Sequence, residues 1–275
     1  MKPPPFTYHA PRDLPAALRT LAGVGGKVLA GGQSLIPMLN MRLAAPEHVV
    51  DINRVAGLDG VEATQAGVTV HALARHADVE RAGVHPLLTR ALKLVAHPVI
   101  RNRGTVVGSL VHADPAAELP AVLAVLGGSV RVARWDGGVS VREVPAEEFF
   151  VGPMESAVGP GELAVSAFFP ALEEGAGVAF EEIARRHGDY ALAGVCAVVT
   201  PGSARVACIG VGARPVVLDL GGNDDWGAAA ALVRDATEPE GDIHATAAYR
   251  RHLVGVLAER ALRHAAREGA AARGA

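Results

Sequence analysis

The chain of 275 residues is long enough for two domains or for one large, subdivided domain. Half of its residues are hydrophobic and 20% are charged, which predicts a globular protein with an ample core rather than a disordered chain. The net charge of -3 gives no basic surface for nucleic acid, and no apolar run approaches the roughly 20 residues that span a bilayer. Nucleic-acid binding and an integral membrane protein are therefore not expected.

The first residues and the cysteines bear on location and metal chemistry. The start, "MKPPPFTYHAPRDLP", lacks the basic region and apolar stretch of a secretory signal, so the cytoplasm is the expected location. Cys196 and Cys208 are the only cysteines, and both lie in apolar, strand-like segments. Two thiols do not supply the four ligands of an iron–sulfur cluster or a structural zinc site. We expect buried structural thiols, and metal chemistry that uses His and carboxylates or belongs to a partner.

The N-terminal fifty residues read as helix, strand, loop, helix, strand. Asp13 is the expected N-cap of a helix over 14–22. A short buried strand over 27–30 precedes a helix over 35–43, and a further strand covers 48–52. Strands separated by helices predict parallel pairing.

A different texture follows, in which strands are joined by turns. Two β-rich runs meet at Asp136-Gly137-Gly138, which predicts a hairpin over 129–144. The remaining elements expected here are strands over 67–74 and 162–169 and helices over 76–82 and 85–96. Acidic residues and glycines interrupt the pattern in "PALEEGAGV", so we place a domain boundary near residue 174.

The last hundred residues read as strands followed by helices. The expected elements are a three-stranded meander over 178–186, 191–200 and 204–212 and helices over 224–236 and 246–269. The tail, 270–275, is expected to fray. The whole is mixed α and β, with a small strand-then-helix domain at its C-terminal end.

Two glycine-bearing loops stand out, although neither G-x-G-x-x-G at a strand–helix junction nor GxxxxGK[ST] occurs. In the first, "AGGQS", Gly31 and Gly32 lack Cβ, so backbone N–H groups can approach an anion closely. Gln33 and Ser34 add side-chain donors, and a helix from Leu35 would point its positive end at the same place. The alternative is an ordinary strand–helix turn in which Ser34 is the N-cap.

The second loop lies about seventy positions later, in "RNRGTVVGSLVHADPAAELP". Thr105, Gly108 and Ser109 again offer small residues and hydroxyls, and Asp114 and Glu118 follow. Two such loops could grip a long ligand that has a central pyrophosphate. A carboxylate nearby would accept hydrogen bonds from its ribityl or ribose hydroxyls.

The charged residues around the second loop have alternative roles. Arg101 and Arg103 are phosphate partners or surface residues. His112, Asp114 and Glu118 form a conceivable two-oxygen, one-nitrogen metal site, but their spacing differs from HExxH. We prefer the interpretation in which Asp114 caps the following helix.

Three stretches carry a resemblance to a known family: "VLAGGQSLIPMLNMRLAAPEHVVDIN", "HPVIRNRGTVVGSLVHADPAAELPAVL" and "RRHGDYALAGV". They resemble the FAD-binding medium subunit of molybdenum hydroxylases, which includes the medium chain of aerobic carbon monoxide dehydrogenase and the flavin domain of xanthine dehydrogenase. The resemblance covers essentially the whole chain, in the family's order. It implies an α+β fold with an FAD-binding domain over 1–174, in which a small parallel α/β part (about 1–55) precedes an antiparallel-sheet part (56–174). A C-terminal domain of antiparallel strands and helices over 175–275 completes it.

The implied cofactor is FAD. The family's first loop holds the FAD pyrophosphate, its second loop has the pattern T-[IV]-G-G-[NS], an acidic residue nine positions later binds the flavin's polyol chain, and an aromatic residue lies near the isoalloxazine ring. The residues of this chain that match are Val28, Leu29, Ala30, Gly31, Gly32, Gln33, Ser34, Thr105, Val107, Gly108, Ser109, Glu118 and Tyr190. From the residues alone, Tyr190 reads as a half-buried core aromatic. No catalytic residue and no metal ligand are expected.

Three departures from the family pattern stand out. Val107 occupies the place of the second loop's first glycine, which predicts a looser backbone approach there. Glu118 is one methylene longer than the usual Asp. Glu181 and Glu182 stand where relatives often have a lysine, and an acid facing the site would disfavour an anionic reduced flavin.

The resemblance also implies a function within a complex. A molybdopterin-containing large subunit would hydroxylate the substrate, and electrons would pass through 2Fe-2S clusters of a small subunit to FAD and then to a terminal electron acceptor. The chain would be an oxidoreductase subunit in a dimer of heterotrimers, in the cytoplasm, including the inner face of the membrane through its complex. Two alternatives are a self-sufficient FAD oxidoreductase with its own small substrate and a flavin-free scaffold subunit.

Overall fold

The computed structural model describes residues 2–222 and 224–274, and its N-terminal part is a small parallel sheet with two helices. The strand order is β1-β3-β2, and both pairings are parallel; parallel pairing was predicted for β2 and β3, whereas β1 was not predicted. Asp13 Oδ1 accepts a hydrogen bond from Ala16 N at 2.7 Å and starts α1 as its N-cap. The elements are β1 (Thr7–His9), α1 (Leu14–Val24), β2 (Lys27–Leu29), α2 (Leu35–Asn40) and β3 (His48–Asp51).

The middle part is a five-stranded antiparallel sheet in the order β4-β5-β10-β6-β7, covered by short helices. The predicted hairpin is present, with Trp135 opposite Val139 across its turn. The strands are β4 (Val61–Thr64), β5 (Gly67–His71), β6 (Ser129–Trp135), β7 (Val139–Pro145) and β10 (Glu162–Pro170), with a separate pair β8 (Phe150–Gly152) and β9 (Glu155–Ser156). The helices are α3 (His76–Ala82), α4 (Pro86–Leu94), α5 (Pro98–Arg101), α6 (Val106–His112), α7 (Glu118–Leu126) and α8 (Ala146–Phe149).

The C-terminal part is an antiparallel meander with two helices, in the order β11-β12-β13-β14. Its elements are β11 (Gly177–Ala184), β12 (Ala191–Thr200), β13 (Ser203–Ile209), β14 (Val216–Gly221), α9 (Trp226–Asp235) and α10 (Ala247–Gly274). The expectation of a frayed tail is wrong for the described residues, because α10 continues through Gly274. Arg273 Nη1 donates to the carbonyl of Gly175 at 2.7 Å, which holds the last turn against the chain before β11.

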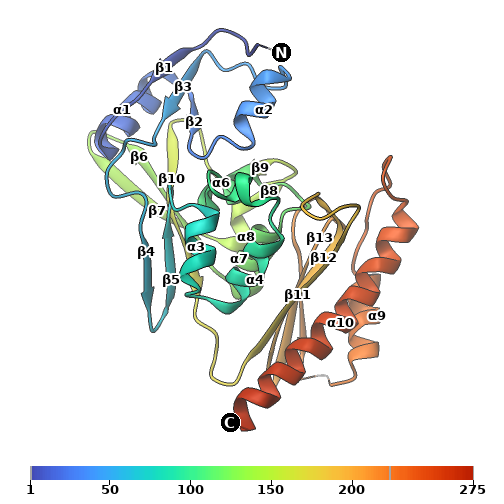
Figure 1. Ribbon diagram of the computed structural model, residues 1–275. Coiled ribbons are helices and arrows are strands. Elements are labelled where there is room, and N and C mark those ends of the chain that lie inside the picture. Colours follow the sequence, from blue (N-terminus) through green and yellow to red (C-terminus); the bar gives the residue numbers. More distant parts are fainter. Residues whose placement is uncertain (1, 223, 275) are drawn as a thin grey trace.

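Figure 1 shows how these parts are layered. The helices α4 and α7 lie between the five-stranded sheet and the C-terminal sheet, and α9 and α10 cover the outer face of the latter. One apolar core joins the middle helices to the inner face of the C-terminal sheet, and a second lies between that sheet and α10. The mixed parallel and antiparallel fold class is therefore confirmed.

The environment of the two cysteines and the character of the helices bear on two expectations from the sequence, structural thiols and no membrane span. Cys196 on β12 and Cys208 on β13 are free and fully buried, and burial raises the pKa of both thiols, that of Cys208 to about 12. They are structural thiols, as expected. Among the helices of the described chain, none combines the length and the apolar character needed to cross a bilayer.

Candidate functional site

The first glycine loop connects β2 to α2 and lines a cavity of about 290 Å³. Within the described chain, the backbone N–H groups of residues 31–34 have no hydrogen-bond acceptor. Partly buried N–H groups without an acceptor are uncommon in folded proteins and mark a place where an anion or water accepts from them. Because α2 has only six residues, its dipole is short, and these N–H groups are the main source of positive potential at the loop.

The glycines of this loop serve two different steric needs. A Cβ on Gly31 would lie 2.4 Å from the carbonyl oxygen of Arg103 and 2.8 Å from Cα of Gly104. The first loop therefore packs directly against the backbone that leads into the second loop. Gly32 has a φ of +76°, a conformation that L side chains rarely adopt.

Ser34 stands at the N-cap position of α2, but its side chain does not cap the helix. It has an αR backbone, and its hydroxyl makes no hydrogen bond to the α2 backbone or to any other described residue. Gln33 Nε2 makes only a long contact with the carbonyl of Gly31, at 3.4 Å. Both side chains line the loop cavity with donor capacity to spare.

The hydroxyls of the second loop make hydrogen bonds within the protein. Thr105 is the N-cap of α6: its Oγ1 accepts from Gly108 N at 3.1 Å, and its carbonyl accepts from Ser109 N at 3.1 Å. The Ser109 hydroxyl lies 3.0 Å from Nε2 of His76. Both hydroxyl oxygens thus already take part in hydrogen bonds within the protein, that of Thr105 as an acceptor, although these residues line the same cavity.

Val107 does not disturb this arrangement. It lies within α6 with a negative φ, and its side chain is 2% exposed and packs in the core between the helices and the sheet. The position requires no left-handed backbone, so the looser approach predicted from the missing glycine does not arise from backbone conformation.

His76, which sequence reasoning missed, contacts Ser109 of the second loop through its ring. It is 3% exposed, and burial lowers its pKa to about 4, with the nearby Arg101 and Arg75 acting in the same direction. Its Nδ1 is buried without a hydrogen-bond partner among the described residues. A neutral ring is therefore expected at physiological pH. Nothing in "HADVERA" marks this histidine, because its partner Ser109 lies 33 residues away.

The loop cavity thus brings together most of the residues expected to bind the cofactor. Of these, Val28, Ala30, Gly31, Gly32, Gln33, Ser34, Thr105, Val107, Gly108 and Ser109 line it. Leu29, Glu118 and Tyr190 do not line it. Arg101 Nε pairs with Glu80 at 2.8 Å, and Arg103 is exposed and meets the first loop through its carbonyl. Neither arginine is placed as a phosphate partner.

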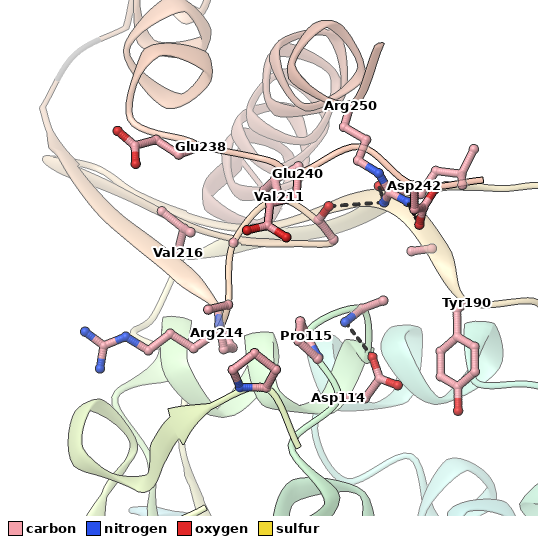
Figure 2. Close-up of a pocket in the computed structure, with 18 of the residues that line it drawn as sticks. Asp114, Pro115, Tyr190, Val211, Arg214, Val216, Glu238, Glu240, Asp242 and Arg250 are labelled. Atoms are coloured by element: carbon pink, nitrogen blue, oxygen red, sulfur yellow. Dashed lines mark hydrogen bonds and ion pairs between the residues drawn. The ribbon is translucent and has the colours of Figure 1, made fainter. Parts of the chain in front are cut away.

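A second cavity, of about 960 Å³, lies between the middle part and the C-terminal sheet, and we call it the Tyr190 cavity. Figure 2 shows Tyr190 and Asp114 on its lower side and Arg250 with its ion-pair partner Asp242 above them. The Tyr190 side chain is 64% exposed, so it is not a core aromatic. Asp114 does not cap α7 as predicted: Ala117 occupies the N-cap position, and Asp114 Oδ1 accepts from Ala116 N at 2.8 Å in the preceding turn.

Glu118, which is buried, and Glu182, which is partly buried, form an acidic pair. Burial, the charge of Glu182 and that of Asp114 raise the pKa of Glu118 to about 8, and burial raises the pKa of Glu182 to about 7. Glu182 Oε2 is buried without a hydrogen-bond partner in the described chain. Glu181, on the opposite side of β11, lies 3.2 Å from Nδ1 of His264 on α10. Only Glu182 of the two therefore faces the inner layer.

Metal binding finds no support in the described residues. No group of three or more His, Cys, Asp or Glu side chains is placed there to hold a metal ion. The donor set of the loop cavity is instead one of backbone amides and hydroxyls, which suits an oxyanion such as a pyrophosphate.

Comparison with known proteins identifies the family. Residues 4–172 match the family described as FAD binding domain in molybdopterin dehydrogenase. The chain belongs to this family. Its cofactor is therefore FAD, and the chain is a subunit of an oxidoreductase, as the sequence predicted.

Members of the family with different substrates are similar along their whole length. The chain is 39% identical to the alpha subunit of the 6-hydroxypseudooxynicotine dehydrogenase complex of Paenarthrobacter nicotinovorans, covering 95% of each chain. It is 34% identical to the carbon monoxide dehydrogenase medium chain of Hydrogenophaga pseudoflava, covering 95% of this chain and 97% of that one. A chain of quinoline 2-oxidoreductase from Pseudomonas putida 86 superposes with a TM-score of 0.88 at 33% identity, covering 98% and 99%. The chain is a medium subunit of the molybdenum hydroxylase type.

Proposed function

We propose that this chain binds FAD between its two glycine loops and passes electrons from iron–sulfur clusters of a partner to a terminal electron acceptor. The observation that carries this proposal is the set of backbone N–H groups of residues 31–34, which have no acceptor in the described chain and border a cavity walled by the second loop. Such amides suit the two negative charges of a pyrophosphate. FAD supplies the redox chemistry when it is bound.

The residues have distinct roles in this proposal. The amides of residues 31–34 and the Ser34 hydroxyl hold the pyrophosphate, and Val28, Leu29 and Ala30 bring the loop to it. Thr105, Val107, Gly108 and Ser109 form the facing wall. Glu118 bonds the polyol hydroxyls, and because its pKa is raised to about 8 by burial, it is protonated at neutral pH and able to donate as well as accept. Tyr190, largely exposed, lies against the isoalloxazine ring.

The partners follow from what this chain lacks. Its two cysteines are buried and are half of the four that a 2Fe-2S centre requires, so the electron donor is another polypeptide. We propose a molybdopterin-containing large subunit and a 2Fe-2S small subunit in a dimer of heterotrimers, located in the cytoplasm. Within the chain we propose residues 1–174 as the FAD-binding domain, with subdomains of about 1–55 and 56–174, and residues 175–275 as a C-terminal domain.

The test is the visible spectrum of the purified chain after incubation with FAD and removal of excess. We expect shifted flavin bands that co-elute with the protein, with one FAD per chain. The same experiment on Gly31→Ala, which crowds the cradle, is expected to yield much less bound flavin. A folded chain that stays colourless would contradict this assignment of the loops.

A second measurement separates the electron-transfer subunit from a self-sufficient flavoenzyme. Aldehydes, purines and N-heterocycles are added anaerobically to the FAD-loaded chain in the absence of other subunits. An electron-transfer subunit keeps its yellow colour with all of them, because the substrate reacts elsewhere. Bleaching by any one of them would assign a substrate site to this chain.

A further inference from the structure

Two side chains outside the glycine loops connect one loop to the other. Asn53, which follows β3, donates through Nδ2 to the carbonyl of Ala30 at 2.8 Å. Arg75, just before α3, donates through Nη2 to Oδ1 of Asn53 at 2.6 Å and through Nη1 to the carbonyl of Arg103 at 2.7 Å. The path Ala30–Asn53–Arg75–Arg103 therefore runs from the first loop to the segment that enters the second.

The amide of Asn53 is held in one orientation. Its Nδ2 also donates to Oδ1 of Asp51 at 2.6 Å, and its backbone N donates to the same oxygen at 2.8 Å. The other carboxylate oxygen, Oδ2, accepts from the Tyr8 hydroxyl at 2.6 Å. With Nδ2 directed at Asp51 and Ala30, only Oδ1 is left to accept from Arg75. Tyr8 and Asp51 thus fix the direction of the bridge.

Arg75 is tied to the second loop by its backbone as well. It forms an isolated antiparallel bridge with Thr105, and the next residue, His76, donates its backbone N to the carbonyl of Gly104 at 2.9 Å. The backbone of this segment therefore moves with the second loop, while the Arg75 side chain reaches back to the first. A planar guanidinium donates in two fixed directions at once, which a lysine ammonium does not reproduce.

The bridge acts where the two loops are already in contact. Gly31 meets the carbonyl of Arg103 so closely that a Cβ would lie 2.4 Å from it, and Arg75 donates to that same carbonyl. The steric contact sets how near the loops approach, and the hydrogen bonds oppose their separation. Together they fix the width of the loop cavity before a ligand arrives.

We propose that Asn53 and Arg75 are positioning residues for FAD: their hydrogen-bonded bridge holds the two glycine loops at the spacing at which both contact one cofactor. This inference rests on the proposed function of the loops. Losing the bridge removes no group that contacts the cofactor, but the loops must then be ordered during binding, which lowers affinity.

The experiment measures the FAD dissociation constant, by quenching of flavin fluorescence, for the full-length chain and its variants. We expect Arg75→Ala and Asn53→Ala each to raise the dissociation constant about tenfold. The double variant should be no weaker than the weaker single variant, because either change breaks the same path. Arg75→Lys keeps the charge and the stem, which favours folding, and should also bind about tenfold more weakly since its single nitrogen does not reproduce the two fixed donor directions of the guanidinium.

Arg90→Ala is the matched control. Arg90 also joins a carbonyl, that of Val178, to a carboxylate, that of Glu268, but it lies between α4 and the C-terminal part rather than between the loops. It should lower the thermal midpoint of the FAD-free chain while the dissociation constant stays within about twofold. At saturating FAD, the visible circular dichroism of the bridge variants should match that of the unchanged chain.

The outcomes separate this inference from the one on which it rests. Bridge variants that bind FAD as tightly as the unchanged chain, while melting earlier like Arg90→Ala, would show a purely structural role and overturn the inference alone. Additive losses in the double variant would also contradict a single path. An unchanged chain that binds no FAD would overturn both the loop assignment and the bridge.

Discussion

The two glycine loops look alike in sequence but differ in how they use their polar groups. The amides of residues 31–34 have no acceptor in the described chain, and the Ser34 hydroxyl has no partner there. In the second loop, Thr105 caps α6, and Ser109 is 3.0 Å from His76. The first loop presents four successive amides and a hydroxyl without partners among the described residues, whereas the hydroxyls of the second loop make hydrogen bonds within the protein.

This difference teaches that a glycine–hydroxyl pattern does not by itself identify a ligand-contacting group. A capped helix terminus is rigid, because its end groups are already bonded. A loop with free amides is costly unless something accepts from them. We therefore interpret the first loop as the cradle and the second as the wall that faces it, and four substitutions test that contrast.

The largest effect is expected from Gly31→Ala. The added methyl group would press on the carbonyl of Arg103 and on Gly104, so the two loops must move apart. Overpacking of this kind costs about 1–3 kcal/mol. Because FAD binding must bring the loops back together against this cost, we expect a loss of FAD affinity of about 5- to 150-fold. Isothermal titration with FAD measures it. Gly138→Ala, in the β6–β7 turn with open space around it, is the control and should bind normally.

The second loop is followed by Glu118, which forms an acidic pair with Glu182, and the first loop has no such pair. The pKa values of Glu118 and Glu182, raised to about 8 and about 7 largely by burial, exceed those of the unfolded chain. The unfolded chain therefore loses these protons first, and the free energy of unfolding falls as pH rises from 5 to 8. Glu182→Gln removes one ionisable group and its charge near Glu118. We therefore expect the variant to be more stable than the unchanged chain by about 2 kcal/mol more at pH 8 than at pH 5, measured as the free energy of unfolding.

Urea unfolding of the FAD-free chain at both pH values measures this gain. Glu181→Gln, one residue away on the other side of β11, is the control. It should change the pH dependence by less than about 0.5 kcal/mol, because surface ion pairs contribute little. Equal effects of the two changes would contradict the burial argument.

Ser109→Ala tests the hydrogen bond that the second loop makes with His76. It leaves Nε2 of the buried His76 without a partner, which costs about 1–2 kcal/mol. We expect lower thermal stability of the FAD-free chain and little change in FAD affinity once the chain is folded. Ser109→Thr retains the hydroxyl and should recover part of the lost stability.

Ser34→Ala tests the opposite property of the cradle and has the smallest expected effect. Because the Ser34 hydroxyl has no partner in the described chain, the stability of the FAD-free chain should change by less than about 0.5 kcal/mol. FAD affinity should fall about three- to tenfold, the value of one hydrogen bond. If Ser34→Ala and Ser109→Ala gave the same profile, the contrast between the loops would fail.

Local signals predicted much of the fold. Asp13 was identified as a cap because its side chain acts within one turn, and the hairpin over 129–144 because its turn residues lie between alternating strands. The strands β1 and β4 were missed because they are short and mostly exposed. The alternating exposure of β14 follows from "VVLDLG", and this period-2 signal could have found it.

The candidate site was harder to predict because its decisive contacts are long-range. The sequence placed the two loops, and the structure brings them to one cavity. It could not show that Gly31 faces the Arg103 carbonyl or that Arg75 reaches Asn53, 22 residues away. The predicted cap of α7 by Asp114 is wrong because Ala117 occupies that N-cap position, and Ser34 stands at the N-cap position of α2 without a side-chain cap hydrogen bond.

The burial of both cysteines has a practical consequence for finding the neighbours of this chain. Neither thiol forms a thiolate at neutral pH, so a maleimide reagent leaves the folded chain unlabelled. A cysteine introduced at Ile243, which is 93% exposed in the segment bordering the Tyr190 cavity, would be the sole reactive position. A photoactivatable crosslinker attached there would capture a polypeptide that covers the opening of the Tyr190 cavity, and mass spectrometry would identify it.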